Sequence, residues 1–246
     1  MRLLQRHANG TLSLTDDLHD DDIPDYVVLS HTWGAPAQET NHVELTEAIN
    51  SMFRWYREAA RCYVYLSDVH AVGIQHNAWQ DDFRNSRWFT RGWTLQELLA
   101  PRLVEFFSSE GIRLGDKISL EKEVHSITGI AVEALRGSPL SDFSVKKRMD
   151  WAAKRKTTRK EDEAYSLLGI FDIYMPLIYG ERERALVRLR EQIDRSIQGP
   201  DPSPYSGTNA PSTSVKSLHP VRKNYRKVHV TILYWEVDEV FDTVRS

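Results

Sequence analysis

The chain has 246 residues, of which 41% are hydrophobic and 27% charged, an ordinary composition for a globular protein with a sizeable core. The net charge of -3 gives no electrostatic footprint for nucleic acid or an anionic membrane, so neither is an expected partner. The single cysteine, Cys62, excludes an intramolecular disulfide and a cysteine-based zinc site. No apolar run approaches the roughly 20 residues of a membrane span, and no secretory signal is present. We therefore expect a cytosolic or nuclear protein and favour the cytoplasm.

Short apolar runs alternate with helical patterns in the first half of the chain. Three runs have the composition of buried strands: residues 26–30, 62–66 and 104–108. Residues 44–60 repeat apolar side chains at helical spacing. Residues 86–100, SRWFTRGWTLQELLA, read as a further helix that Pro101 stops. Strands and helices in alternation, with nearly continuous apolar strands, predict a parallel α/β sheet flanked by helices.

The second half of the chain has a helical pattern. Helices are predicted over residues 119–128, 131–136, 144–155 and 182–197. Ser144 is a plausible N-cap, and Thr158 with Glu161 matches a capping box. We expect four units: an α/β domain at 1–118, a helical extension at 119–198, a disordered Pro- and Ser-rich linker at 199–220 and a short tail at 221–246. The tail contains one strand-like alternation, which cannot form a domain alone.

Polar residues follow the predicted strands at one rim of the sheet. In open parallel sheets, ligands bind beyond the carboxyl ends of the strands. Ser30 and Trp33 end the first strand and Asp68 follows the second, while Trp93 and Glu97 lie near the start of the next helix, four residues apart. A carboxylate against an indole loses solvation, which raises its pKa and suits acid–base chemistry.

Residue spacing alone does not exclude a non-catalytic role for Glu97. Glu97 would then be a solvated helix acid, or it would pair with Arg91 or Arg102. The histidines and aspartates of residues 68–82 lack the spacing of a metal site, so no metal is expected, and no phosphate-binding or dinucleotide motif is present. The basic run at 146–160 reads as a solvated helical face. A buried, inert thiol is the expected state of Cys62.

Several long segments of the sequence resemble the fungal heterokaryon incompatibility (HET) domain. These are MRLL at the start, DIPDYVVLSHTWG, EAINSMFRWYREAARCYVYLSDV, SRWFTRGWTLQELLAPRLVEFF and RLGDKISLEKEVHSITGI. Residues 151–181 resemble the helical segment that commonly follows that domain. The resemblance implies a role in vegetative incompatibility, nonself recognition and programmed cell death in filamentous fungi, with protein partners or self-association.

The HET domain is itself a distant relative of TIR domains, which implies a TIR-like, flavodoxin-like sheet. Residues 92–98, GWTLQEL, resemble the TIR pattern whose glutamate supports cleavage of NAD, with Thr94 in place of the usual cysteine. The resemblance implies Glu97 as the catalytic acid and NAD as a substrate, with no cofactor. The substrate-binding residues would be Ser30, Trp33, Asp68, Arg91 and Trp93.

The chain also departs from the family pattern. HET domains carry several dozen residues, including a strand and a helix, where this chain has only APAQETNHVELT between residues 34 and 47. We therefore expect a fold that lacks one strand–helix unit at the sheet edge. Two alternatives to an NAD-cleaving enzyme stand beside it: a non-enzymatic signalling module that self-associates through the aromatic stretch, and an inactive, degenerate copy.

Overall fold

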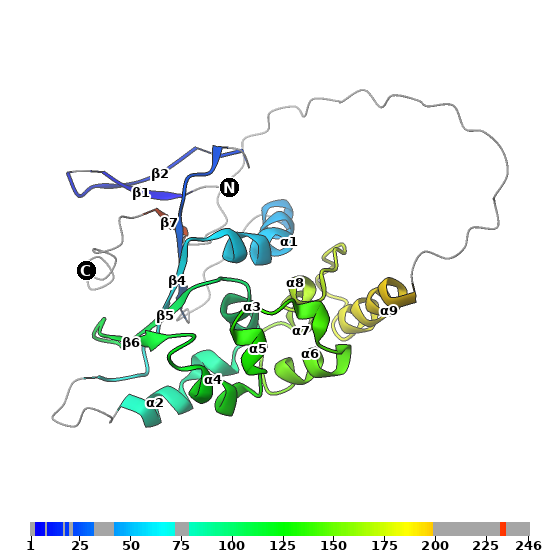
Figure 1. Ribbon diagram of the computed structural model, residues 1–246. Helices are drawn as coiled ribbons and strands as arrows, with labels where there is room; N and C mark the ends of the chain where they lie inside the picture. Colours follow the sequence, from blue (N-terminus) through cyan, green and yellow to red (C-terminus); the bar gives the residue numbers. More distant parts are fainter. Residues whose placement is uncertain are drawn as a thin grey trace.

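The computed structural model describes residues 3–7, 9–16, 18–19, 22–31, 42–71, 79–198 and 232–234. Its centre is a seven-stranded mixed sheet in the order β2-β1-β7-β3-β4-β5-β6, which Figure 1 shows with the helices gathered mainly to one side. The strands are β1 (Leu4–Arg6), β2 (Leu12–Leu14), β3 (Val27–His31), β4 (Arg61–Tyr65), β5 (Val104–Phe107), β6 (Arg113–Asp116) and β7 (Ile232–Tyr234).

The three middle strands confirm the predicted α/β sheet. β3, β4 and β5 are parallel neighbours in chain order, with Val28 opposite Cys62 and Cys62 opposite Val104. Helix α1 (His42–Glu58) makes the crossover from β3 to β4, as its apolar spacing predicted. Parallel strands need such a crossover because the end of one strand and the start of the next lie at opposite ends of the sheet. The single helix α1 spans this distance, although the segment between residue 34 and the helix is short.

The outer strands were not predicted, with one exception. β1 and β2 form an antiparallel hairpin, and β6 pairs antiparallel with β5. The exception is the strand-like alternation near the C-terminus, of which the structure describes β7. This strand pairs antiparallel with β3 and parallel with β1. β7 therefore has a paired ladder on both sides. The predicted linker at 199–220 lies outside the described residues.

The helix predicted over residues 86–100 is wrong as a single element. The structure has a 3-10 helix η2 (Arg87–Thr90) and a separate short helix α3 (Thr94–Leu99). Ser86 caps η2 through its side chain, whereas Arg91 adopts an extended conformation and forms a parallel bridge to Lys156. The extended backbone at Arg91, which forms this bridge, therefore separates η2 from α3.

The second half is helical as predicted. Its helices are α4 (Glu121–Thr128), α5 (Val132–Leu135), η3 (Leu140–Asp142), α6 (Val145–Ala152), α7 (Asp162–Tyr165), α8 (Leu168–Phe171) and α9 (Arg184–Gln198). Ser144 caps α6 by accepting from the backbone of Lys147. The capping box is wrong: α7 begins after Glu161 without a side-chain cap, because the Glu161 carboxylate instead accepts from the backbone of Gly180 and Arg182.

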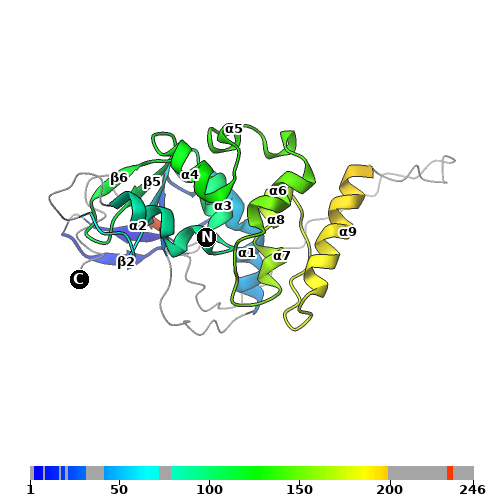
Figure 2. The same cartoon turned by 90° about the horizontal axis from the view of Figure 1, so that it is seen from below.

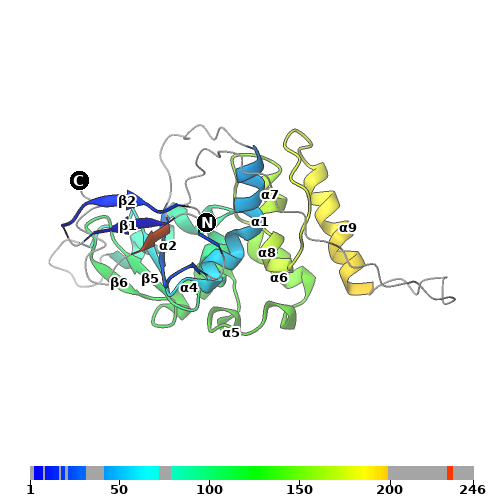
Figure 3. The same cartoon turned by 90° about the horizontal axis from the view of Figure 1, so that it is seen from above.

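One hydrophobic cluster extends through both halves of the chain. It contains Val28 and Val64 from the sheet and Leu168 and Ile193 from the helical half. Figures 2 and 3 show α1, α7 and α8 side by side between the sheet and α9. The boundary at residue 118 stays a prediction, but the packing is continuous across it.

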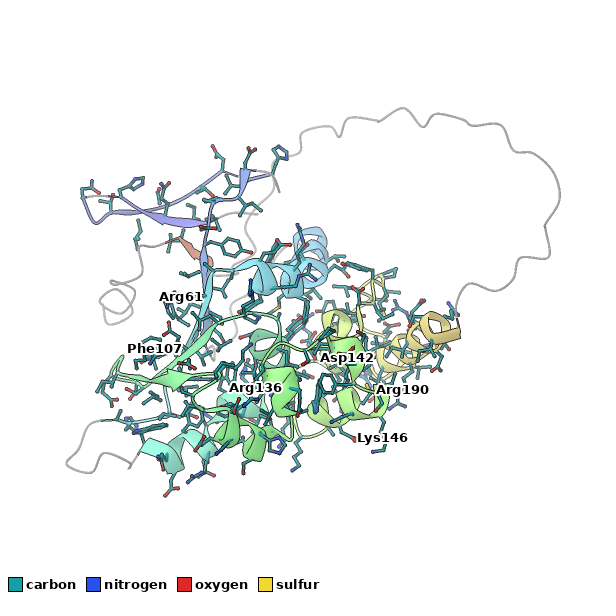
Figure 4. The ribbon with its side chains drawn as sticks, viewed as in Figure 1. Arg61, Phe107, Arg136, Asp142, Lys146 and Arg190 are labelled. Carbon is teal, nitrogen blue, oxygen red and sulfur yellow. The ribbon has the colours of Figure 1, made fainter. Side chains whose placement is uncertain are left out.

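The opposite face of the sheet has a much smaller cluster. Its buried members are Val27, Tyr63 and Phe107, with Leu4 and Leu29 packed against them. Figure 4 places Arg61 and Phe107 on the sheet, away from the helical side that carries Lys146 and Arg190. The described helix α2 (Trp79–Asn85) contributes Phe83 to the large cluster rather than to this face. Among the described helices none is long and apolar enough to cross a membrane.

Candidate active site

The side chain of Glu97 lies at the end of β3, buried to 7% exposure in α3. Its Oε2 accepts a hydrogen bond from the hydroxyl of Ser30, which in turn accepts from the indole N–H of Trp88 at 2.7 Å. An indole can only donate, so the Ser30 proton must point to the carboxylate. The hydroxyl of Tyr56 also hydrogen-bonds Glu97. Glu97 is therefore a buried acid with polar partners, and a solvated helix acid is excluded.

The strand pattern explains why Ser30 faces this acid. Alternate residues of a strand point to opposite faces, and Val28 belongs to the helix-side cluster whereas Val27 and Leu29 belong with the other face. Ser30 therefore points toward the helices, where a hydroxyl without a partner would be costly. Glu97 and Trp88 supply one partner on each side of it.

Burial raises the pKa of Glu97 to about 7, although several groups work in the opposite direction. The hydrogen bonds from Ser30 and Tyr56 lower the pKa, as do the charges of Arg91 and Arg155. At neutral pH the carboxyl group is accordingly close to half ionised. A carboxyl group in this state can take up or release a proton near physiological pH, as a general acid or base requires.

Arg155 reaches this site from the connection after α6. Its Nη1 donates to the carbonyl oxygen of Arg91 at 3.0 Å and to the hydroxyl of Thr94 at 2.8 Å. The Thr94 hydroxyl itself donates to the carbonyl of Trp88 at 2.6 Å. The residue at position 94, where the TIR pattern has cysteine, thus links Arg155 to the segment that carries Trp88.

A close backbone approach holds the two halves together here. Gly92 donates to the carbonyl of Lys156 at 2.8 Å, and Lys156 donates to the carbonyl of Thr90 at 2.6 Å. A Cβ atom at Gly92 would overlap the side chain of Thr157. Glycine at position 92 therefore leaves room for the Thr157 methyl group beside the bridge of Arg91 to Lys156.

Trp93 hydrogen-bonds to the helical half of the chain. Its indole N–H is directed to Asp162 at 3.4 Å, and the other oxygen of Asp162 accepts from Tyr179 at 3.0 Å. Trp93 is the N-cap residue of α3 and has a helical backbone conformation. The indole that is hydrogen-bonded into the Glu97 site, through the Ser30 hydroxyl, is that of Trp88, and a role for Trp93 beside Glu97 stays a prediction.

The remaining predicted site residues have different positions. Asp68 accepts hydrogen bonds from the hydroxyl of Ser86 and the backbone of Arg87, both at 2.8 Å. Burial alone would raise the pKa of Asp68, but these hydrogen bonds lower it, and the carboxylate serves to fix the start of η2. Arg91 lies close enough to Glu97 to act on its pKa. Trp33 lies outside the described residues.

Three residues of the site were missed from the sequence: Tyr56, Trp88 and Arg155. Tyr56 fits the apolar stripe of α1, and Trp88 reads as core, so neither carries a separate local signal. Arg155 stands in a basic run that was interpreted as a solvated face. A buried carboxylate does require compensating groups, which was the available reason to look for a distant arginine.

Two other buried ionisable groups lie near the site. Burial raises the pKa of the Cys62 thiol, which is fully buried as predicted for an inert cysteine. Burial lowers the pKa of Lys117 to about 8; its ammonium donates to Leu98 and Pro101 carbonyls at the end of α3. Within the described ranges, no three histidine, cysteine, aspartate or glutamate side chains gather as a metal site would require.

The fold and the site together define a mixed α/β protein with parallel central strands and a buried acid near the carboxyl end of β3. Within that class, the chain is similar to the vegetative incompatibility protein HET-E-1 of Podospora anserina, with 48% identity over 243 residues. The match covers 79% of this chain and 18% of that protein. No family model matches the chain, and no solved structure matches it.

The alignment with the Podospora protein is longer than the part of this chain that it covers. The matched region extends over 243 residues but takes up only 79% of a 246-residue chain. Several dozen positions of the Podospora protein therefore have no counterpart in this chain. The chain spans less than a fifth of the length of that relative.

Proposed function

We propose that this chain acts in fungal heterokaryon incompatibility as a death effector of nonself recognition, and that its α/β half cleaves NAD with Glu97 as the catalytic acid. The biological role is supported by the similarity to a vegetative incompatibility protein at 48% identity together with the HET-like segments of the sequence. The chemical role rests on one observation, the buried Glu97 carboxyl group with a pKa of about 7.

Cleavage of NAD breaks the bond between the nicotinamide nitrogen and the ribose. Nicotinamide leaves as a neutral molecule with the bonding electron pair, and water adds to the sugar carbon and gives up a proton. Positive charge develops on the ribose in the transition state, as in other glycoside hydrolyses. The catalytic acid Glu97 would take part in its ionised form: in a site of low polarity the carboxylate would stabilise this charge and accept the proton from water, which returns it to the protonated form.

The rest of the TIR-like hypothesis belongs to the same proposal. A missing edge strand and its helix would account for the unmatched positions of the relative and for the small cluster on the second sheet face. β7 lies beside β3, which would be the edge left open by that loss. We place the protein in the cytoplasm and propose protein partners or self-association as its trigger.

The alternative of a self-associating module predicts that Trp88 or Trp93 is exposed. Trp88 is 1% exposed and Trp93 is partly buried against the core cluster, which argues against an interface built on Trp88. Self-association through another surface stays a prediction. A degenerate, inactive copy is the remaining alternative, and the gaps in the match are the observation that favours it.

The test is nicotinamide release from NAD by the purified full chain at concentrations that permit oligomerisation. We expect turnover by the wild type and a loss of about a hundredfold or more in Glu97→Gln, by analogy with the removal of other catalytic groups. Glu191→Gln removes an exposed glutamate of α9 and should leave the rate unchanged. Equal silence of the wild type and Glu97→Gln would overturn the enzymatic proposal.

A further inference from the structure

The guanidinium group of Arg155 has an unused donor beside the buried acid. Its Nη1 is fixed by the Arg91 carbonyl and the Thr94 hydroxyl. Its Nη2 is buried and has no hydrogen-bond partner among the described residues. A buried donor without a partner costs about 1–3 kcal/mol, and more when it belongs to a charged group. A ligand oxygen that accepts from this nitrogen would remove that cost.

Glu97 does not use this donor. Within the described part of the chain, Arg155 and Glu97 form no hydrogen bond or ion pair, although the charge of each acts on the other. Ser30 and Tyr56 serve the carboxyl group instead. Burial lowers the pKa of Arg155 to about 10, so the guanidinium stays charged at neutral pH. The site thus contains a fixed positive charge with one unused nitrogen, Nη2.

We propose that Arg155, assisted by the nearby charge of Arg91, binds a phosphate group of the nucleotide substrate next to Glu97. A charged guanidinium N–H forms strong hydrogen bonds to phosphate oxygens, and the two bonds made by Nη1 hold the free Nη2 in place. The inference rests on the proposed function in so far as the phosphate belongs to the substrate. It also assigns the helical half a direct part in the site, because Arg155 follows α6.

The occupied site has a defined electrostatic consequence. A phosphate beside Glu97 disfavours the ionised carboxylate and therefore binds the protonated protein more tightly. At pH 8 a carboxyl group with a pKa of about 7 is protonated in about one molecule in ten, so binding at that pH is weakened about tenfold. The other groups that face Glu97 are Tyr56, Cys62, Arg91 and Arg155. None of them adds a second negative charge at pH 8.

The experiment is titration calorimetry at pH 8 and constant ionic strength, with the full chain and two probes, inorganic pyrophosphate and ADP. We expect both to bind the wild type, ADP more tightly because it adds nucleoside contacts. Arg155→Gln should weaken pyrophosphate binding by about tenfold to a hundredfold, the range for a charged hydrogen bond. Glu97→Gln should strengthen it by about tenfold, because the competing charge is gone.

Arg148→Gln is the matched control, since Arg148 lies in α6 and also has a buried Nε without a partner among the described residues. It should bind pyrophosphate like the wild type. Arg155→Lys keeps the charge without the planar edge and should bind less tightly than the wild type; it replaces Arg155→Gln if that variant does not fold. Unchanged binding in the folded Arg155 variants, or no binding by the wild type, overturns the inference.

The two proposals fail separately in these measurements. Binding that depends on Arg155 without nicotinamide release removes the enzymatic proposal and keeps the phosphate site. Nicotinamide release with an unchanged Michaelis constant in Arg155→Gln removes the phosphate site and keeps the enzyme. Equal affinity for pyrophosphate and ADP would assign the site to a free anion rather than a nucleotide and would overturn that part of the inference.

Discussion

Replacement of Glu97 by glutamine has an effect on stability that depends on pH in a calculable way. Burial raises the pKa of Glu97 from 4.5 to about 7 in the folded protein. Between these values the folded state binds more protons than the unfolded state, so the free energy of unfolding falls as the pH rises. A pKa shift of this size changes the free energy of unfolding by about 3 kcal/mol, and this stabilisation, present at pH 4, is fully lost by about pH 8. The glutamine variant has no such loss.

The quantity to measure is the difference in free energy of unfolding between Glu97→Gln and the wild type at pH 5, 6, 7 and 8. Urea is the denaturant of choice because it leaves the ionic strength unchanged, and tryptophan fluorescence reports the transition. The difference should move by about 3 kcal/mol in favour of the variant between pH 5 and pH 8. With an m-value near 3 kcal/mol per M, the midpoint difference moves by about 1 M.

The change with pH of the difference in free energy of unfolding between variant and wild type reports on Glu97 alone. Tyr56 and Cys62 have pKa values raised well above their ordinary ones, so both stay protonated over the range. Any constant cost of the amide in place of the carboxyl group cancels between pH values. A difference that stays constant within about 0.5 kcal/mol would mean that Glu97 titrates normally. The buried-acid description of the site would then be wrong.

Three further substitutions test the surroundings of this acid. Ser30→Ala removes the hydrogen bond to Glu97 and should lower the free energy of unfolding by about 1–3 kcal/mol. It should also move upward the pH window, the pH range over which the urea series shows the free energy of unfolding falling as Glu97 ionises. A window that moves downward would contradict the hydrogen bond. Trp93→Phe removes only the contact to Asp162, so unfolding should lose about 1 kcal/mol or less with the pH window unchanged, and a shifted window would place Trp93 at the acid after all. Lys117→Met removes a buried amine whose pKa is lowered to about 8; the wild type should gain about 2 kcal/mol on the variant from pH 8 to pH 10, and a loss over that range would refute the burial.

The middle of the fold could be predicted from the sequence because each element carries its own local signal. Residues 26–30, 62–66 and 104–108 are apolar runs of strand length, and the structure places strands within one residue of each. The outer strands were harder to place. β2 is exposed along its length and has no apolar signal, whereas β7 has a strand-like alternation but partners, β1 and β3, that lie more than 200 residues away in sequence. Pairing at that distance leaves no trace in local periodicity.

The site was partly predictable for a similar reason. Strand ends locate Ser30, and the next helix locates Glu97, because a parallel sheet brings these positions to one edge. The hydrogen bond from the Trp88 indole to Ser30 could not be predicted, because the stretch reads as one helix and the break after η2 accompanies a bridge between Arg91 and Lys156. That bridge joins residues more than 60 positions apart, which local periodicity does not reveal.

The helical half has a physical part in the acid site that follows from charge and packing together. A carboxyl group buried as deeply as Glu97 is costly when ionised unless opposite charge lies close to it. Arg155 supplies such a charge, and the hydrogen bonds around Thr94 and Gly92 hold the segment that carries it against η2 and α3. Loss of that segment would remove both the charge and the support of Trp88. The acid of the α/β half therefore depends on residues beyond position 118, and a protein that ended there would keep Glu97 without the groups that make it a site.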